Sequence, residues 1–68
     1  MKTIDWEYIL KNAERKYVSA RYDAHEAYRF NDEHPSALNR TALNNAWRLY
    51  RKEEKRWIAL QLAFQKTP

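Results

Sequence analysis

Apolar and small side chains recur at alternating intervals of four and three residues on both sides of Pro35. This spacing is typical of helices that pack against each other along one stripe. Two stripes can be traced: Trp6, Leu10, Ala13, Tyr17, Ala20, Ala24 and Ala27, and then Leu43, Ala46, Tyr50, Glu53, Trp57, Leu60 and Phe64. If the chain folds back at Pro35, these stripes meet and form a seam between two antiparallel helices.

One register aligns the two stripes along their whole length. Trp6 then faces Phe64, and Ala20 faces Tyr50. Large side chains meet small ones at several levels, which allows helices to pack closely. We therefore predict an all-α fold, a two-helix antiparallel hairpin.

The helix boundaries follow from capping and helix-breaking residues. Thr3 is a candidate cap for the first helix, and Pro35 removes His34 from the helical region. Ser36, or Pro35 as first helical residue, begins the second helix. The prediction is one domain over residues 1–68, with a helix over about 4–31, a turn over about 32–35 and a helix over about 36–65.

Glu53 is the one charged residue of the predicted seam, and the register places it opposite Tyr17. A hydrogen bond between the Tyr17 hydroxyl and the Glu53 carboxylate would satisfy both groups and disfavour slipped registers. The alternative is that the carboxylate reaches the edge of the seam and solvent.

Composition argues against an enzyme or a metalloprotein. The chain has no Cys and no Gly, which excludes disulfides, thiolate metal sites and glycine-rich phosphate loops. His25 and His34 are not spaced as paired ligands, and Ser19 and Ser36 lack any activation motif. We expect no catalytic or metal site, no cofactor and no small-molecule substrate, since a hairpin offers no deep pocket.

A 68-residue hairpin buries only one stripe per helix, so additional apolar surface must be covered. We expect a homodimer that forms a four-helix bundle through one of two apolar shoulders. One shoulder contains Leu38, Ala42, Leu49 and Ala63, and the other contains Trp47, Ile58 and Leu62. Alternatively, a different protein docks there, with candidate contacts at Leu38, Trp47, Leu49, Ile58 and Leu62.

Thirteen Lys and Arg against nine Asp and Glu leave a net charge of +4. Basic and aromatic side chains alternate on the face of the first helix opposite the seam, and basic side chains cluster in the middle of the second helix. The second set lies level with Arg15, Lys16 and Arg21 and forms with them a basic belt around the middle of the hairpin. The belt and the outer stripe of the first helix suit phosphate contacts and base stacking. The candidate nucleic-acid contacts are Tyr8, Lys11, Arg15, Tyr22, Arg29, Arg48, Arg51, Lys52 and Lys55. The competing interpretation is an ordinary solvated face.

The alanines of the seam and the chain length resemble those of small dimeric helical-hairpin proteins of the Rop type, whose known member is a plasmid copy-number protein that binds RNA. The size also resembles accessory proteins from the early regions of temperate phages. These resemblances concern architecture, and no functional residue of either group is carried over.

We therefore expect a small non-enzymatic accessory or regulatory protein that binds RNA or DNA through the basic belt. The alternative is a protein-interaction module, such as a phage or plasmid regulator that docks on a host protein. A third hypothesis is a purely structural assembly element. No apolar segment resembles a signal peptide or a membrane anchor, so the expected location is the cytoplasm.

Overall fold

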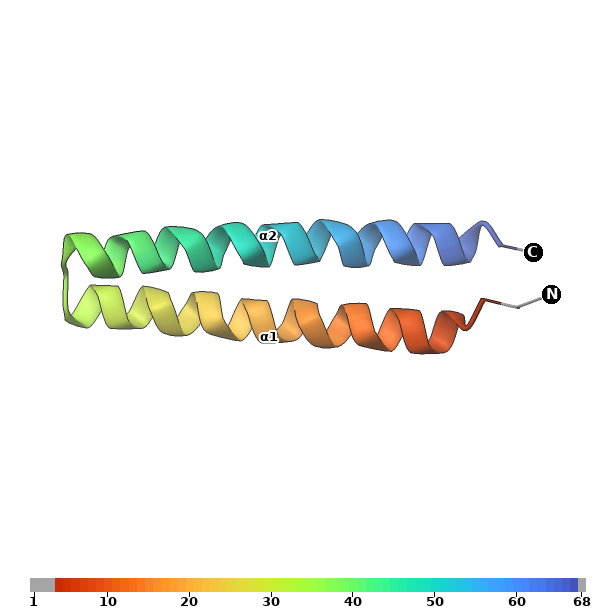
Figure 1. Ribbon diagram of the computed structural model, residues 1–68, viewed down its shortest axis with the longest axis horizontal. Coiled ribbons are helices and arrows are strands. Elements are labelled where there is room, and N and C mark those ends of the chain that lie inside the picture. The colour runs from red at the N-terminus through yellow and green to blue at the C-terminus, as the bar shows by residue number, and fades with distance from the viewer. Residues whose placement is uncertain (1–3, 68) are drawn as a thin grey trace.

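The computed structural model describes residues 4–67 and consists of two long antiparallel helices joined by a short turn (Figure 1). α1 spans Trp6–Glu33 and α2 spans Ala37–Gln65. The hairpin is a rod of 53 × 16 × 15 Å, with the turn at one end and both ends of the chain at the other. The predicted all-α hairpin is confirmed.

Capping residues set where each helix begins. The Tyr8 backbone N–H donates to Asp5 Oδ1, and the Asn39 backbone N–H donates to Ser36 Oγ, both at 3.0 Å. Asp5 therefore caps α1, which begins and ends two residues later than predicted, whereas Thr3 lies outside the described residues. Ser36 caps α2, which agrees with one of the two predicted starts of the second helix.

The turn is tied to the second helix by a side chain. The Asn39 side-chain amide donates to the His34 carbonyl at 2.6 Å, while the His34 backbone N–H donates back to Phe30 at 2.8 Å. His34 itself has left the helical region, with φ −133° and ψ 73°, as its position before Pro35 demands. The polar turn thus places the two helices side by side.

The predicted seam is the core of the hairpin. Its most deeply buried members are Ala13, Ala20 and Ala24, which are 1%, 4% and 0% exposed. These small residues let the helix backbones approach closely, so the larger seam side chains pack beside them at the edges of the contact. Among the described residues, no large side chain is fully buried.

Aromatic rings fill the edges of the seam. Trp6 contacts Phe64 at one end, with ring centroids 5.7 Å apart, which confirms the predicted register. In the middle, the Tyr17 ring stacks between Trp57 at 5.0 Å and Tyr50 at 5.7 Å, and Trp47 meets Tyr50 edge-on at 5.3 Å. We call the four rings in the middle, those of Tyr17, Trp47, Tyr50 and Trp57, the aromatic ladder. Such contacts stabilise the fold beyond simple area burial.

The predicted hydrogen bond between Tyr17 and Glu53 is wrong. Glu53 lies half-buried on the seam, but its Oε2 is inaccessible and has no hydrogen-bond partner among residues 4–67. The Tyr17 ring instead stacks on Trp57, with an interplanar angle of 9°, and on Tyr50. These two rings precede and follow Glu53 along the seam. The predicted register is correct, but Tyr17 contacts aromatic rings of α2 and not the Glu53 carboxylate.

Candidate functional site

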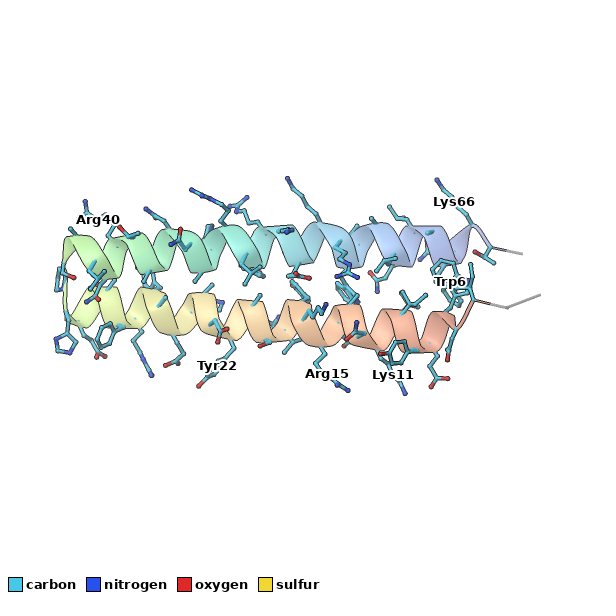
Figure 2. The ribbon with its side chains drawn as sticks, in the orientation of Figure 1. Trp6, Lys11, Arg15, Tyr22, Arg40 and Lys66 are labelled. Carbon is cyan, nitrogen blue, oxygen red and sulfur yellow. The ribbon has the colours of Figure 1, made fainter. Side chains whose placement is uncertain are left out.

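The outer stripe of α1 is exposed to solvent. Tyr8 is 68% exposed and Tyr22 is 66% exposed. Lys11, Arg15 and Tyr22 project away from α2 in Figure 2. Aromatic and basic side chains therefore do share one accessible surface, as the sequence pattern predicted.

Two cations of this stripe are already paired with neighbouring acids. Lys11 Nζ lies 2.9 Å from Glu7 Oε1, and Arg29 lies 2.7 Å from Glu26 Oε2. Three of these side chains are largely exposed and Glu26 is half-buried, so each pair adds little to stability. Their main effect is electrostatic, because each acid cancels most of the field of its basic neighbour. Arg15 makes neither of these pairs.

α2 presents a different surface on the opposite side of the rod. Arg48, Arg51, Lys52 and Lys55 are all exposed and occupy the turns of α2 that face away from the seam. We call these four residues the α2 basic face. The Arg51 guanidinium lies over the Trp47 ring, 5.7 Å from its centroid.

The two helices differ sharply in charge. α2 carries six Lys and Arg against two Glu, a net charge of +4, and one of those Glu is the seam residue Glu53. α1 carries five Lys and Arg against six Asp and Glu, a net charge of −1. The predicted belt therefore has two unequal halves on opposite sides of the hairpin. Arg15 and Arg48 do not share one surface of a single hairpin.

The predicted protein-contact residues are exposed but do not form one patch. Each flank of the hairpin is a long side along which both helices are accessible. Leu38 and Leu49, 80% and 47% exposed, belong to one flank. Trp47 and Ile58, 39% and 46% exposed, belong to the other flank. Leu62, 51% exposed, lies on the outer side of α2. A single partner therefore cannot cover all five on one face.

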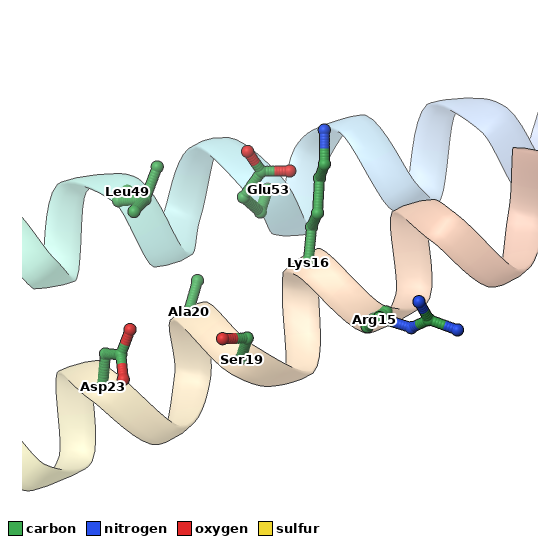
Figure 3. A pocket seen from close by; sticks show the side chains of 7 residues that line it. All are labelled: Arg15, Lys16, Ser19, Ala20, Asp23, Leu49 and Glu53. Carbon is green, nitrogen blue, oxygen red and sulfur yellow. The ribbon is translucent and has the colours of Figure 1, made fainter.

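A groove of about 350 Å³ runs along the first of these flanks, at the middle of the rod (Figure 3). Residues of both helices line it: Arg15, Lys16, Ser19, Ala20, Asp23, Leu49 and Glu53. We call this side the groove flank. The opposite side is the ladder flank, because it holds the aromatic ladder with Arg21 over Tyr17 and Arg51 over Trp47. The groove brings acidic and basic groups together, and its walls include the Glu53 carboxylate whose Oε2 is unpartnered.

The ladder also affects the acidity of one tyrosine. Hydrogen bonding with the Tyr17 side chain raises the pKa of Tyr50 above its ordinary value of 10.0, and loss of hydration and the nearby Glu54 charge act in the same direction. The neutral phenol is thus favoured in the folded hairpin. This arrangement favours the packed, uncharged form of the Tyr50 ring.

Sequence reasoning overlooked part of the groove. Asp23 and Phe30 were not assigned to any site, and Lys16 was assigned only to the basic belt, although all three follow Ile9 at intervals of seven residues. A repeat of seven places side chains along one line of a packed helix. The sequence therefore contained a sign that these residues share one side of α1. The structure shows that this side borders the groove.

No group of three His, Asp or Glu among residues 4–67 is arranged to hold a metal ion. Over the same residues, neither helix has an apolar stretch sufficient to span a bilayer. Comparisons of the chain with protein-family models, with curated proteins and with solved structures found no match.

Proposed function

We propose that this chain is a non-enzymatic nucleic-acid-binding protein that contacts phosphates through the α2 basic face. The observation that supports the proposal most directly is the concentration of positive charge on α2, which carries a net charge of +4 while α1 carries −1. A surface of this kind attracts a polyanion over a distance of about 10 Å at ordinary ionic strength.

The spacing of the cations suits a phosphate backbone. Arg48, Lys52 and Lys55 follow each other at intervals of four and three residues, so they line one side of α2 over about 10 Å. A line of this length can contact more than one phosphate of a nucleic-acid backbone without any change in the helix.

The α2 basic face also carries a cost that an anionic partner would relieve. Arg48 and Lys52, like Arg51 and Lys55, are like charges one helical turn apart. Each such pair destabilises an isolated helix by about 0.2–0.5 kcal/mol. Bound phosphates would convert this repulsion into attraction. Because phosphate contacts carry no sequence information, we expect binding that depends on salt and hardly on base sequence.

The test compares two variants that lose the same charge from opposite sides of the rod. One replaces Arg48, Lys52 and Lys55 with Gln, and the matched control replaces Lys11, Arg15 and Arg29 with Gln. Fluorescence anisotropy with labelled duplex DNA, hairpin RNA and a single strand, at two salt concentrations, gives affinity and salt slope. Circular dichroism checks that each variant is helical.

The α2 variant should lose at least tenfold in affinity and have a shallower salt slope, by about 0.7–0.9 for each phosphate contact removed. The α1 variant should stay close to the parent protein. Equal losses in both variants would show that net charge, and not the α2 basic face, controls binding. Absence of binding by the parent protein to all three nucleic acids would overturn the proposal.

The exposure of Trp47 favours a second candidate function, docking on another protein such as a host factor. Trp47 is 39% exposed, contacts Tyr50 edge-on and is covered on one face by Arg51. Trp, Tyr and Arg are the residues most often found at binding hot spots. Under this function Trp47→Ala should abolish capture of the partner, whereas the Gln variants of α2 should retain it.

A further inference from the structure

Four side chains of α1 form a line along the groove flank: Ile9, Lys16, Asp23 and Phe30. Their order is apolar, positive, negative, apolar. The pattern is self-complementary about a point between Ser19 and Ala20. When a second copy of the same line runs antiparallel to the first, each apolar end meets an apolar end and each charge meets its opposite.

We propose that the groove flank is the interface of a homodimer, in which α1 packs antiparallel against α1 of a second copy and α2 against α2. Lys16 then pairs with Asp23 of the second copy, and Ile9 contacts Phe30 of the second copy. The groove flank adjoins the α2 basic face and shares Lys52 with it, but the inference does not depend on the proposed function.

The same two-fold axis brings together apolar residues of α2. In the seam register, Ala20 lies level with Tyr50, so the axis crosses α2 between Tyr50 and Arg51, and Leu49 lies opposite the aliphatic stem of Lys52 of the second copy. Toward the ends, Leu38 lies opposite Ala63 of the second copy, and Ala42 lies opposite Ala59. Leu38 is 80% exposed in the single hairpin, and Phe30 at the same end is 54% exposed. Both are covered in the dimer.

Charge complementarity favours the groove flank over the ladder flank. The ion pairs within residues 4–67 are Lys11 with Glu7 and Arg29 with Glu26, so neither Lys16 nor Asp23 has a charged partner in the hairpin. On the ladder flank, in contrast, Arg21 already lies over Tyr17, and Arg51 lies over Trp47.

Glu53 provides another reason to expect a partner at the groove. Its Oε2 is shielded from solvent and lacks a hydrogen-bond partner among residues 4–67, and a shielded polar atom without a partner is costly. The proposed axis passes within about one helical turn of Glu53. It brings Lys52 of the second copy close enough to supply a cation there.

The dimensions of the flank match what a stable dimer requires. A side of a rod that measures 53 × 16 × 15 Å has a projected area of about 800 Å², which is the area that each partner buries in a standard interface. The hairpin alone fully buries no large side chain within its described part, so this additional burial is a large fraction of the total.

The charges also select the orientation. If the two turns lay at the same end, α1 would face α2 of the second copy. Lys16 would then lie beside Arg56, and Asp23 would lie beside Leu49, leaving one repulsive contact and one unpaired carboxylate. The antiparallel arrangement avoids both.

The first experiment uses two single-cysteine variants, because the chain has no cysteine of its own. Ser19 and Val18 are adjacent, exposed and level with the middle of the rod, but Ser19 lies toward the groove flank and Val18 toward the ladder flank. Treatment of Ser19→Cys with a short bis-maleimide should give a covalent dimer in high yield. Val18→Cys should remain largely uncrosslinked.

The second experiment exchanges the charges. Lys16→Asp and Asp23→Lys should each weaken the dimer by about tenfold, because each creates two repulsive contacts across the axis. The double variant should recover most of the parent affinity. Sedimentation equilibrium measures the dissociation constants, and circular dichroism checks helicity. A monomeric parent protein, cross-linking at Val18 instead of Ser19, or a double variant no tighter than the single ones would overturn the proposal.

Discussion

The indole of Trp57 lies on the Tyr17 ring with centroids 5.0 Å apart and planes only 9° from parallel. Tyr17 comes from α1 and Trp57 from α2, so this stack joins the two helices directly. The opposite face of Tyr17 contacts Tyr50, also from α2. One tyrosine of α1 is therefore held between two rings of the other helix, in a hairpin whose fully buried core consists of alanines.

Tyr17→Ala should be among the most destabilising single substitutions in the chain. It removes two ring contacts and leaves space at the middle of the seam, for a loss of about 2–4 kcal/mol in the free energy of unfolding. Urea unfolding followed by circular dichroism measures the change. Tyr22→Ala, on the exposed outer stripe of α1, is the matched control and should cost about 0.5 kcal/mol or less.

Ala24→Leu should destabilise the hairpin through overpacking. Ala24 is 0% exposed, so the added side chain can fit only if the helices move apart, at a cost of about 1–3 kcal/mol. The same substitution at the exposed Ala37 should be nearly neutral. If the two variants had equal melting temperatures, close packing at Ala24 would be disproved.

Ser36→Ala should lower stability by about 1 kcal/mol, because the Asn39 backbone N–H loses the Ser36 hydroxyl as its acceptor. Ser36→Asp keeps an acceptor at that position and should retain most of the parent stability. Thermal unfolding of the three proteins at equal concentration distinguishes a loss of capping from a general effect at the turn.

Alkaline pH should weaken the fold through Tyr50. Its pKa is raised above 10.0 in the folded hairpin, so the folded state holds this proton more tightly than the unfolded chain does. The stabilisation is complete below pH 10.0 and is lost as the pH rises through the raised pKa. Ultraviolet absorbance should show one tyrosine ionising after the others. In Tyr50→Phe that late step should be absent, and its persistence would assign the shift to another tyrosine.

Lys55→Glu should stabilise α2 while it removes a proposed phosphate contact. The new carboxylate lies one turn from Arg51 and replaces repulsion with attraction, for a gain of about 0.4–1 kcal/mol at low salt. Lys55→Gln removes the repulsion only and should gain about half as much. Unfolding in low and high salt checks the electrostatic origin, since the gain should shrink as salt increases.

The seam was predictable because burial constrains every third or fourth residue, and a stripe repeated over about six turns determines both the helices and their register. The capping residue of α1 was missed because Thr3 and Asp5 are both competent caps. The partner of Tyr17 was missed for a different reason. Stacking on Trp57 depends on side-chain rotamers that the spacing of residues does not specify.

The candidate sites were predictable to a lesser degree. Exposure of Tyr8, Tyr22 and the α2 cations follows from their distance from the seam. The ion pairs of Lys11 and Arg29 depend on side-chain conformation, and they reduce the α1 stripe to a weaker candidate. The line from Ile9 to Phe30 was visible in the sequence, but its meaning depends on the groove beside it.

The unequal charge of the two helices has a kinetic consequence. A rod with its positive charge along one long side has an electric dipole across its width, perpendicular to its axis. In the field of a polyanion, this dipole turns α2 toward the charged surface before contact and aligns the rod lengthwise with it. Under the proposed function, the first collision with a nucleic acid would therefore be made by a whole side of the molecule and not by a tip, and orientation would be largely complete before binding begins.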